Sequence, residues 1–144
     1  MAVDVLVETN IARPREEVAR FAGDPTNAPR WYSNIKSVKW LTPPPVALGS
    51  QMTFVAHFLG KRLEYTYEIV ELVPGSRLVM RTAQGPFPME TTYTWESRGD
   101  ATHMTLRNRG EPSGFSRLMA PMMSLAMRRA TTQDLLRLKA VLEN

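Results

Sequence analysis

The chain has 144 residues, of which 43% are hydrophobic and 22% charged, and this is the composition of a globular domain rather than a disordered chain. It contains no cysteine, which excludes disulfides and thiolate metal sites. The formal net charge is +4 and the basic residues are spread along the sequence, so we expect one domain over residues 1–144 and no nucleic-acid surface.

The N-terminus gives no sign of export. Residues 1–8 lack the basic start and the long apolar run of a signal peptide. No window approaches the roughly 18 apolar residues that a membrane span needs. We therefore expect a cytoplasmic protein without integral membrane association. A monomer and a homodimer are both compatible with the sequence.

The first elements are a strand and two short helices. Residues 3–11 alternate between apolar and polar side chains, which predicts a strand with one buried face. Pro14 suits the first position of a helix over 15–22, which the residues 23–25 (Gly-Asp-Pro) end. A second short helix is expected to run towards Trp31.

The middle of the chain predicts six further strands. From Ile35 to Arg109 the hydrophobic period is two, and turn signals recur every eight to twelve residues or so. We expect strands near 35–41, 50–59, 61–73, 76–83, 88–97 and 101–109. The links between them are short, which favours antiparallel neighbours.

Residues from Phe115 to Leu142 predict a long helix whose two halves differ. The rear half is amphipathic, with Leu135 and Leu138 on one face, and should lie on the sheet. The front half is apolar on almost every side, and Pro121 is expected to kink or restart the helix there. It carries Met119, Met122, Met123 and Met127. Methionine is flexible and polarisable, so this front suits a cover over a ligand, although plain core filling would use the same residues.

The order of strand, two short helices, six strands and long helix predicts an α+β fold, in which a curved seven-stranded antiparallel sheet surrounds the C-terminal helix. Five segments in this order carry a resemblance to a known family: residues 12–21, 31–35, 63–78, 101–105, and 118–121 ahead of 134–143. Together they resemble the polyketide cyclase/dehydrase-like branch of the START-like (SRPBCC) superfamily.

The resemblance implies a helix-grip fold with a hydrophobic ligand in a cavity under the long helix. Members of that superfamily cyclise or dehydrate polyketides, transport lipids, sense hormones or bind partners. The resemblance carries over no catalytic residue, because the family has no universal catalytic motif.

Strand parity predicts which side chains face that cavity. The inward set combines apolar walls with a few hydroxyl, amide and indole groups, as a small-molecule site requires. The candidate ligand-binding residues are Trp31, Phe54, Phe58, Tyr65, Tyr67, Met80, Thr82, Met89, Thr91, Tyr93, Trp95, Leu106 and Asn108, together with Met119, Met122, Met123 and Met127. The alternative for these residues is plain core packing, and Trp31 could equally plug the helix pair against the sheet.

The sequence assigns no catalytic group. Strand parity predicts that His57 and His103 point outward. The one carboxylate that it predicts to point inward is Glu71, and a β-bulge near Ile69 and Val70 would instead turn Glu71 to the outer face. The chain lacks nucleotide-binding and nucleophile motifs, so we expect no metal ion and no cofactor.

Three functions remain open at this stage. The first is a carrier or sensor of a lipid-, polyketide- or aromatic-like molecule. The second is a polyketide cyclase or dehydratase that acts on a ligand in the same cavity. The third is a lipid- or protein-interaction module that uses the methionine-rich front of the long helix.

Overall fold

The computed structural model describes residues 3–58, 60–85, 88–110 and 120–144. The elements in chain order are β1 (Val3–Ile11), α1 (Arg15–Ala22), the 3₁₀ turn η1 (Pro25–Asn27), α2 (Ala28–Trp31), β2 (Ile35–Trp40), β3 (Gln51–Phe58), β4 (Lys61–Val73), β5 (Arg77–Gln84), β6 (Met89–Arg98), β7 (Ala101–Gly110) and α3 (Ala120–Glu143). Each predicted strand is present within one residue of its predicted bounds. The part of the long helix predicted ahead of Ala120 lies outside the described residues.

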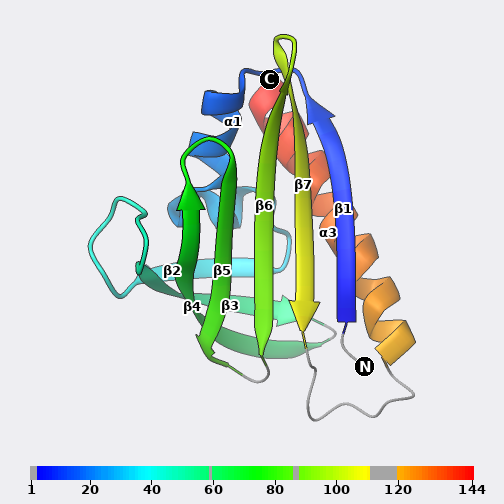
Figure 1. Cartoon of the computed structure of the whole chain (residues 1–144). Coiled ribbons are helices and arrows are strands. Elements are labelled where there is room, and N and C mark those ends of the chain that lie inside the picture. The colour runs from blue at the N-terminus through cyan, green and yellow to red at the C-terminus, as the bar shows by residue number, and fades with distance from the viewer. Residues whose placement is uncertain (1–2, 59, 86–87, 111–119) are drawn as a thin grey trace.

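All seven strands form one antiparallel sheet in the order β1-β7-β6-β5-β4-β3-β2. In Figure 1, β6, β7 and β1 stand upright beside one another, while β2 and β3 run across them at a steep angle. The sheet therefore curls, and α3 runs along the concave side past β1 and β7. This arrangement confirms the predicted α+β class and the seven-stranded curved sheet.

A β-bulge in β4 contributes to the bend. Ile69 pairs with Met80, but the next pair joins Glu71 to Val79, so one residue of β4 is unpaired at this point. Beyond the bulge Leu72 packs against the core, and Glu71 is exposed, where its carboxylate accepts a hydrogen bond from Arg77 Nε at 3.0 Å. The β-bulge considered from the sequence is therefore present, and it turns the carboxylate of Glu71 away from the inner face of the sheet.

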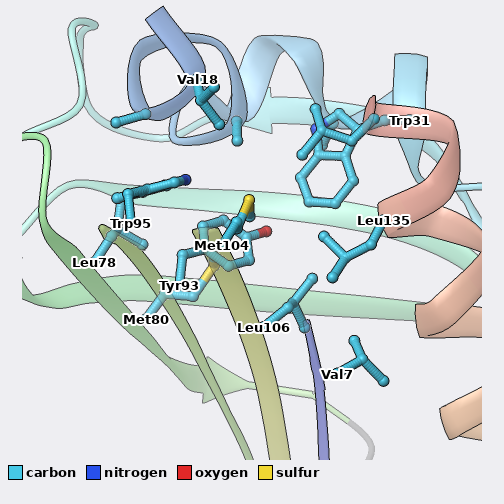
Figure 2. Close-up of a cluster of buried hydrophobic side chains, with 14 of the residues drawn as sticks. Val7, Val18, Trp31, Leu78, Met80, Tyr93, Trp95, Met104, Leu106 and Leu135 are labelled. Carbon is cyan, nitrogen blue, oxygen red and sulfur yellow. The ribbon is translucent and has the colours of Figure 1, made fainter. Parts of the chain in front are cut away.

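The core lies between the concave face of the sheet and the helices. Leu135 and Leu138 of α3 are 1% and 0% exposed, as the amphipathic pattern of the rear half predicts. Figure 2 shows Leu135 and Trp31 on the helical side of this core, opposite Leu106 and Tyr93 on the strands. Full burial of a leucine side chain contributes about 1.5–3 kcal/mol to folding, so these two leucines stabilise the packing of α3 on the sheet.

The convex face carries cross-strand ion pairs. Glu90 accepts hydrogen bonds from both Arg81 and Arg109, and Asp4 pairs with Arg107. His103 lies on the same face, between the side chains of Glu8 and Asn10, and His57 is exposed. The outward orientation predicted for both histidines is therefore confirmed.

Pro121 lies in the first turn of α3 as described. The kink or restart predicted at this proline involves residues ahead of Ala120, which lie outside the described part of the chain. No helix in the described part of the chain is both long and apolar enough to cross a membrane.

Candidate functional site

A cavity of about 150 Å³ lies between the inner face of β3 to β7 and the middle of α3. Its wall is formed by Tyr32, Asn34, Ile35, Phe54, Ala56, Leu63, Tyr65, Tyr67, Met80, Met89, Thr91, Tyr93, Asn108, Met123, Met127, Ala130, Thr131 and Asp134. An apolar cavity of roughly this volume accommodates a benzene-sized molecule.

Ten of the candidate ligand-binding residues lie on this wall. They are Phe54, Tyr65, Tyr67, Met80, Met89, Thr91, Tyr93, Asn108, Met123 and Met127. Their strands place the first eight there because alternate residues of β3 to β7 point to the concave face. Whether they hold a ligand remains a prediction.

Four candidates are oriented inward but lie away from this wall. Leu106 and Trp31 are fully buried in the core, and Trp95 lies farther along β6, in the wall of a different cavity. The hydroxyl of Thr82 accepts a hydrogen bond from the backbone N–H of Met89 at 2.9 Å. Parity predicts the face of a strand but not the position along it, which is why Thr82, Trp95 and Leu106 face inward without being part of this wall.

Trp31 packs the short helices against the sheet, which is the second of the two roles considered for it from the sequence. Its ring is 0% exposed and lies 4.1 Å from that of Tyr32 and 5.8 Å from that of Tyr93, measured between centroids. It therefore fills the space between α2 and the sheet and supports two tyrosines of the wall from behind.

The prediction for Met122 is wrong. Its side chain is 64% exposed, because α3 turns Met123 and Met127 to the sheet and leaves Met122 on the solvent side. An all-round apolar helix segment does not reveal which of its faces is buried. Met119 and the side chain of Phe58 lie outside the described residues.

Two tyrosine hydroxyls meet at one end of the cavity. The Tyr32 and Tyr93 oxygens are 2.6 Å apart, so one hydroxyl donates to the other. Burial raises the pKa of both phenols, and the hydrogen bond to Tyr32 partly offsets this for Tyr93. Both groups are therefore protonated at neutral pH and can orient a ligand only as neutral hydroxyls.

A second polar group lines the wall between β4, β6 and β7. The hydroxyl of Thr91 donates to Asn108 Oδ1 at 2.7 Å, and Tyr67 lies on the same wall. Burial raises the pKa of Tyr67 to about 12, with a smaller opposing effect from Thr91. The hydrogen bond between Thr91 and Asn108 fixes the orientation of these two polar side chains at the cavity surface.

The one carboxylate on the described wall is Asp134, which sequence reasoning missed. It is 3% exposed, and its Oδ1 accepts hydrogen bonds from the backbone N–H and the hydroxyl of Ser33, each at 3.0 Å. Burial raises the pKa of Asp134, against the opposing effects of the Ser33 bonds and of Arg137. Its negative charge in turn contributes to the raised pKa values of Tyr32 and Tyr93, so these groups form one electrostatic unit.

The sequence does contain a signal for Asp134. It lies seven residues after Met127 and four before Leu138, a spacing that puts all three on one face of a helix. A helical wheel that is searched for apolar residues alone does not single out a charged residue within the apolar sector.

The cavity thus combines an apolar body with two polar groups in its wall, one around Tyr32, Tyr93 and Asp134 and one at Thr91 and Asn108. Tyr32, Tyr93 and Asp134 can hydrogen-bond a hydroxyl or carbonyl group of a ligand, and the rings and methionines can pack against its apolar part. Among the described residues, no three His, Asp or Glu side chains converge as a metal site would require.

Residues 2–143 match the model of a family described as polyketide cyclase/dehydrase and lipid transport. No curated protein matches the sequence. The similar solved structures include a protein from Thermus thermophilus, with 21% identity over 95% of this chain and 94% of that one and a TM-score of 0.83. They also include the Zhui aromatase/cyclase from Streptomyces sp. R1128, with 13% identity over 97% and 93% of the two chains and a TM-score of 0.81.

A START superfamily protein from Mycobacterium smegmatis is similar as well, with 18% identity over 97% of this chain and 94% of that one and a TM-score of 0.75. At these identities the likeness shows a shared fold, which is the START-like helix-grip fold. The activities named for those proteins remain theirs, because one fold can support different chemistries.

Proposed function

The chain belongs to the polyketide cyclase/dehydrase and lipid transport family, and we propose that it binds a small aromatic-like hydrophobic molecule between the sheet and α3 as a carrier or sensor. The observation that carries this proposal is the largely apolar cavity with a few polar groups in its wall. The ligand's apolar part lies among the rings and methionines, and its hydroxyl or carbonyl group faces Tyr32, Tyr93 and Asp134.

The aromatic character of the ligand follows from the wall. The rings of Tyr65 and Phe54 lie 6.0 and 5.7 Å from that of Tyr67, and the Phe54–Tyr67 pair meets edge to face. Rings prefer offset-stacked or edge-to-face neighbours at such separations, and each favourable pair adds about 0.5–1.5 kcal/mol beyond area burial. A flat ring inserted here meets several such partners.

The size of the ligand follows from the volume. As it stands the cavity of about 150 Å³ admits a single ring. A larger body would have to displace side chains, and Met123 and Met127 on α3 are the ones able to move, because methionine has three rotatable bonds. We therefore expect affinity to rise from one ring to two and to fall for a rigid tetracyclic compound.

A binding role is favoured over catalysis because the tyrosines stay neutral at pH 7 and Asp134 is the only carboxylate among the described wall residues. A reaction that needs both a general acid and a general base has no second partner of suitable pKa there. Holding and releasing a ligand requires none.

A cyclase or dehydratase is the second candidate function, and Asp134 is the observation that favours it. A buried carboxyl with a raised pKa that faces a cavity is the kind of group used in proton transfer. Cyclisation also needs a chain held in one folded conformation, which this cavity could provide. The third alternative, an interaction module, would rest on the exposed Met122 and Leu125 of α3.

A matched pair of substitutions on α3 tests the binding proposal. Ala130 lies on the cavity wall and Ala140 is exposed on the same helix. Ala130→Leu should weaken the binding of 2-naphthol, measured by calorimetry, at least about tenfold, since an isobutyl group takes the place of the ligand's apolar body. Ala140→Leu should leave it unchanged. Equal affinity in the parent and both variants would show that 2-naphthol does not bind in this cavity.

Asp134→Asn separates the two functions. The amide oxygen of asparagine can still accept the Ser33 hydrogen bonds, so a carrier should keep its affinity within a few fold. An enzyme should bind as before but lose turnover of a poly-β-keto model substrate by about 10²-fold or more, the usual contribution of a general acid or base. Absence of any turnover in the unsubstituted protein would count against the cyclase or dehydratase.

A further inference from the structure

A second cavity lies at the other end of the concave face. It has a volume of about 710 Å³ and is enclosed by α1, the loop after β2, the turn between β4 and β5, and the inner face of β5 and β6. It shares no described wall residue with the first cavity. The volume is within the range of small-molecule sites, roughly 300–1,000 Å³.

The floor of this cavity is apolar. It is built from Leu78 and Trp95, which are 1% and 3% exposed, and from Ala19 of α1. Figure 2 shows Leu78 and Trp95 side by side beneath α1, at some distance from Leu135 and Trp31. Val46 and Leu72 continue the apolar wall. A flat hydrophobic body can be buried on this floor.

Hydrogen-bond donors without partners gather at the same place. Among the described residues three buried side-chain polar atoms lack a partner: the Nε of Arg15, and the Nε1 atoms of Trp31 and Trp95. Two of these three belong to the wall of the second cavity, and all three are donors. Buried donors are almost always paired in folded proteins, so two unpaired donors in one cavity require an explanation.

The charged residues at the rim of the second cavity indicate what charge a bound ligand would carry. Arg20 is exposed at the rim and makes no ion pair or hydrogen bond with any described residue. Glu16 comes no closer than 3.5 Å to the far end of Arg15, and Asp24 is occupied in accepting the backbone N–H of Thr26 at 3.0 Å. The two arginines attract an anion, and the two neighbouring carboxylates disfavour a doubly charged one.

We propose that the second cavity binds a small monoanionic aromatic carboxylate, as a site separate from the ligand of the first cavity. The carboxylate accepts hydrogen bonds from the guanidinium of Arg15, whose planar donors match carboxylate oxygens. The aromatic body lies on Leu78 and on the ring of Trp95. A neutral analogue would lack the acceptor that Arg15 needs, and a phosphate would meet Glu16 and Asp24.

Indole N–H signals in ¹H–¹⁵N NMR spectra report directly on this site, because the chain has only three tryptophans. The probe is 1-naphthoate, with 1-naphthalenemethanol as the neutral comparison, and Trp40→Phe and Trp95→Phe assign the signals. We expect naphthoate, bound against the indole ring, to shift the Trp95 signal and to leave that of the core residue Trp31 in place. The alcohol should bind at least about tenfold more weakly, since it offers no charge-assisted bond.

Arg15→Gln should likewise weaken naphthoate binding about tenfold or more, whereas Arg98→Gln, at an exposed arginine outside this wall, should not. Ala130→Leu should leave naphthoate binding at this site intact, which separates the second cavity from the first. An unmoved Trp95 signal, equal binding of the alcohol, or full affinity in Arg15→Gln would each overturn the proposal.

Discussion

Tyr93→Phe removes one hydroxyl of the pair that closes the polar end of the first cavity. The Tyr93 side chain is 3% exposed, and its oxygen lies 2.6 Å from that of Tyr32. The substitution leaves the ring in place, so packing against Trp31 and Trp95 is retained. What is lost is one buried hydrogen bond, and the Tyr32 hydroxyl loses its partner.

The expected cost follows from that unpaired hydroxyl. Leaving a buried polar group unsatisfied costs about 1–3 kcal/mol, whereas replacing both partners with apolar groups of the same shape is nearly neutral. Tyr93→Phe should therefore lower the free energy of unfolding by about 1–2 kcal/mol, and the double variant Tyr32→Phe/Tyr93→Phe by clearly less than the sum of the two single changes. For a chain of this size about 1 kcal/mol corresponds to roughly 3 °C in Tm.

The assay is urea unfolding of the four proteins of this double-mutant cycle, followed by circular dichroism at constant pH. The predicted coupling between the two hydroxyls is about 1–2 kcal/mol. Strictly additive effects, or a Tyr93→Phe protein as stable as the parent, would show that the two tyrosines do not share a hydrogen bond and that the polar end of the cavity is not built as described.

Three further outcomes follow from buried and exposed groups elsewhere. Because burial raises the pKa of Asp134, the folded state holds its proton more tightly than the unfolded chain, so this group favours folding below the unfolded pKa of about 3.9 and that contribution is lost as pH rises through the folded pKa. Asp134→Asn removes this loss, so its Tm relative to the parent should rise between pH 4 and pH 7; parallel Tm curves would contradict the burial of an ionisable group. Leu138→Ala should cost about 2–5 kcal/mol in urea unfolding and Leu136→Ala under about 1 kcal/mol, since the first side chain is 0% and the second 53% exposed; similar costs would mean that α3 packs with another face. Glu90→Gln should lower stability by about 1 kcal/mol or less, with a difference that shrinks in 1 M salt because the pairs with Arg81 and Arg109 are on the surface; a difference independent of salt would count against ion pairing.

The fold could be predicted from the sequence because its strands are regular. A period of two fixes the face of each side chain, and this period alone places Phe54, Tyr67 and Tyr93 inward and the histidines outward. The bulge in β4 could be anticipated only as an alternative, because the unpaired residue is fixed by pairing with β5, and a second register shift, between Ile35 and Ser37 of β2, gave no comparable signal.

The site was less predictable, because the periodicity of a strand shows which face a side chain is on but not which part of the concave face it borders. Parity could not tell that Tyr93 borders the first cavity and Trp95, two residues farther along the same strand, the second. The rotation of α3 was equally hidden where the helix is apolar on all sides, which misplaced Met122. Asp134 depends on contacts between distant segments, since Ser33 holds its carboxylate from 101 residues away in the chain.

Methionine methyl signals in ¹³C NMR spectra test the central claim most directly, because methionines lie inside and outside the first cavity. Met80, Met89, Met123 and Met127 line it, whereas Met104 is fully buried elsewhere in the core and Met122 is exposed. With an aromatic ligand such as 2-naphthol, the four lining methyls should shift and show intermolecular nuclear Overhauser effects, and those of Met104 and Met122 should not. Contacts confined to Met122, or none at any of the four lining methyls, would contradict a ligand held between the sheet and α3.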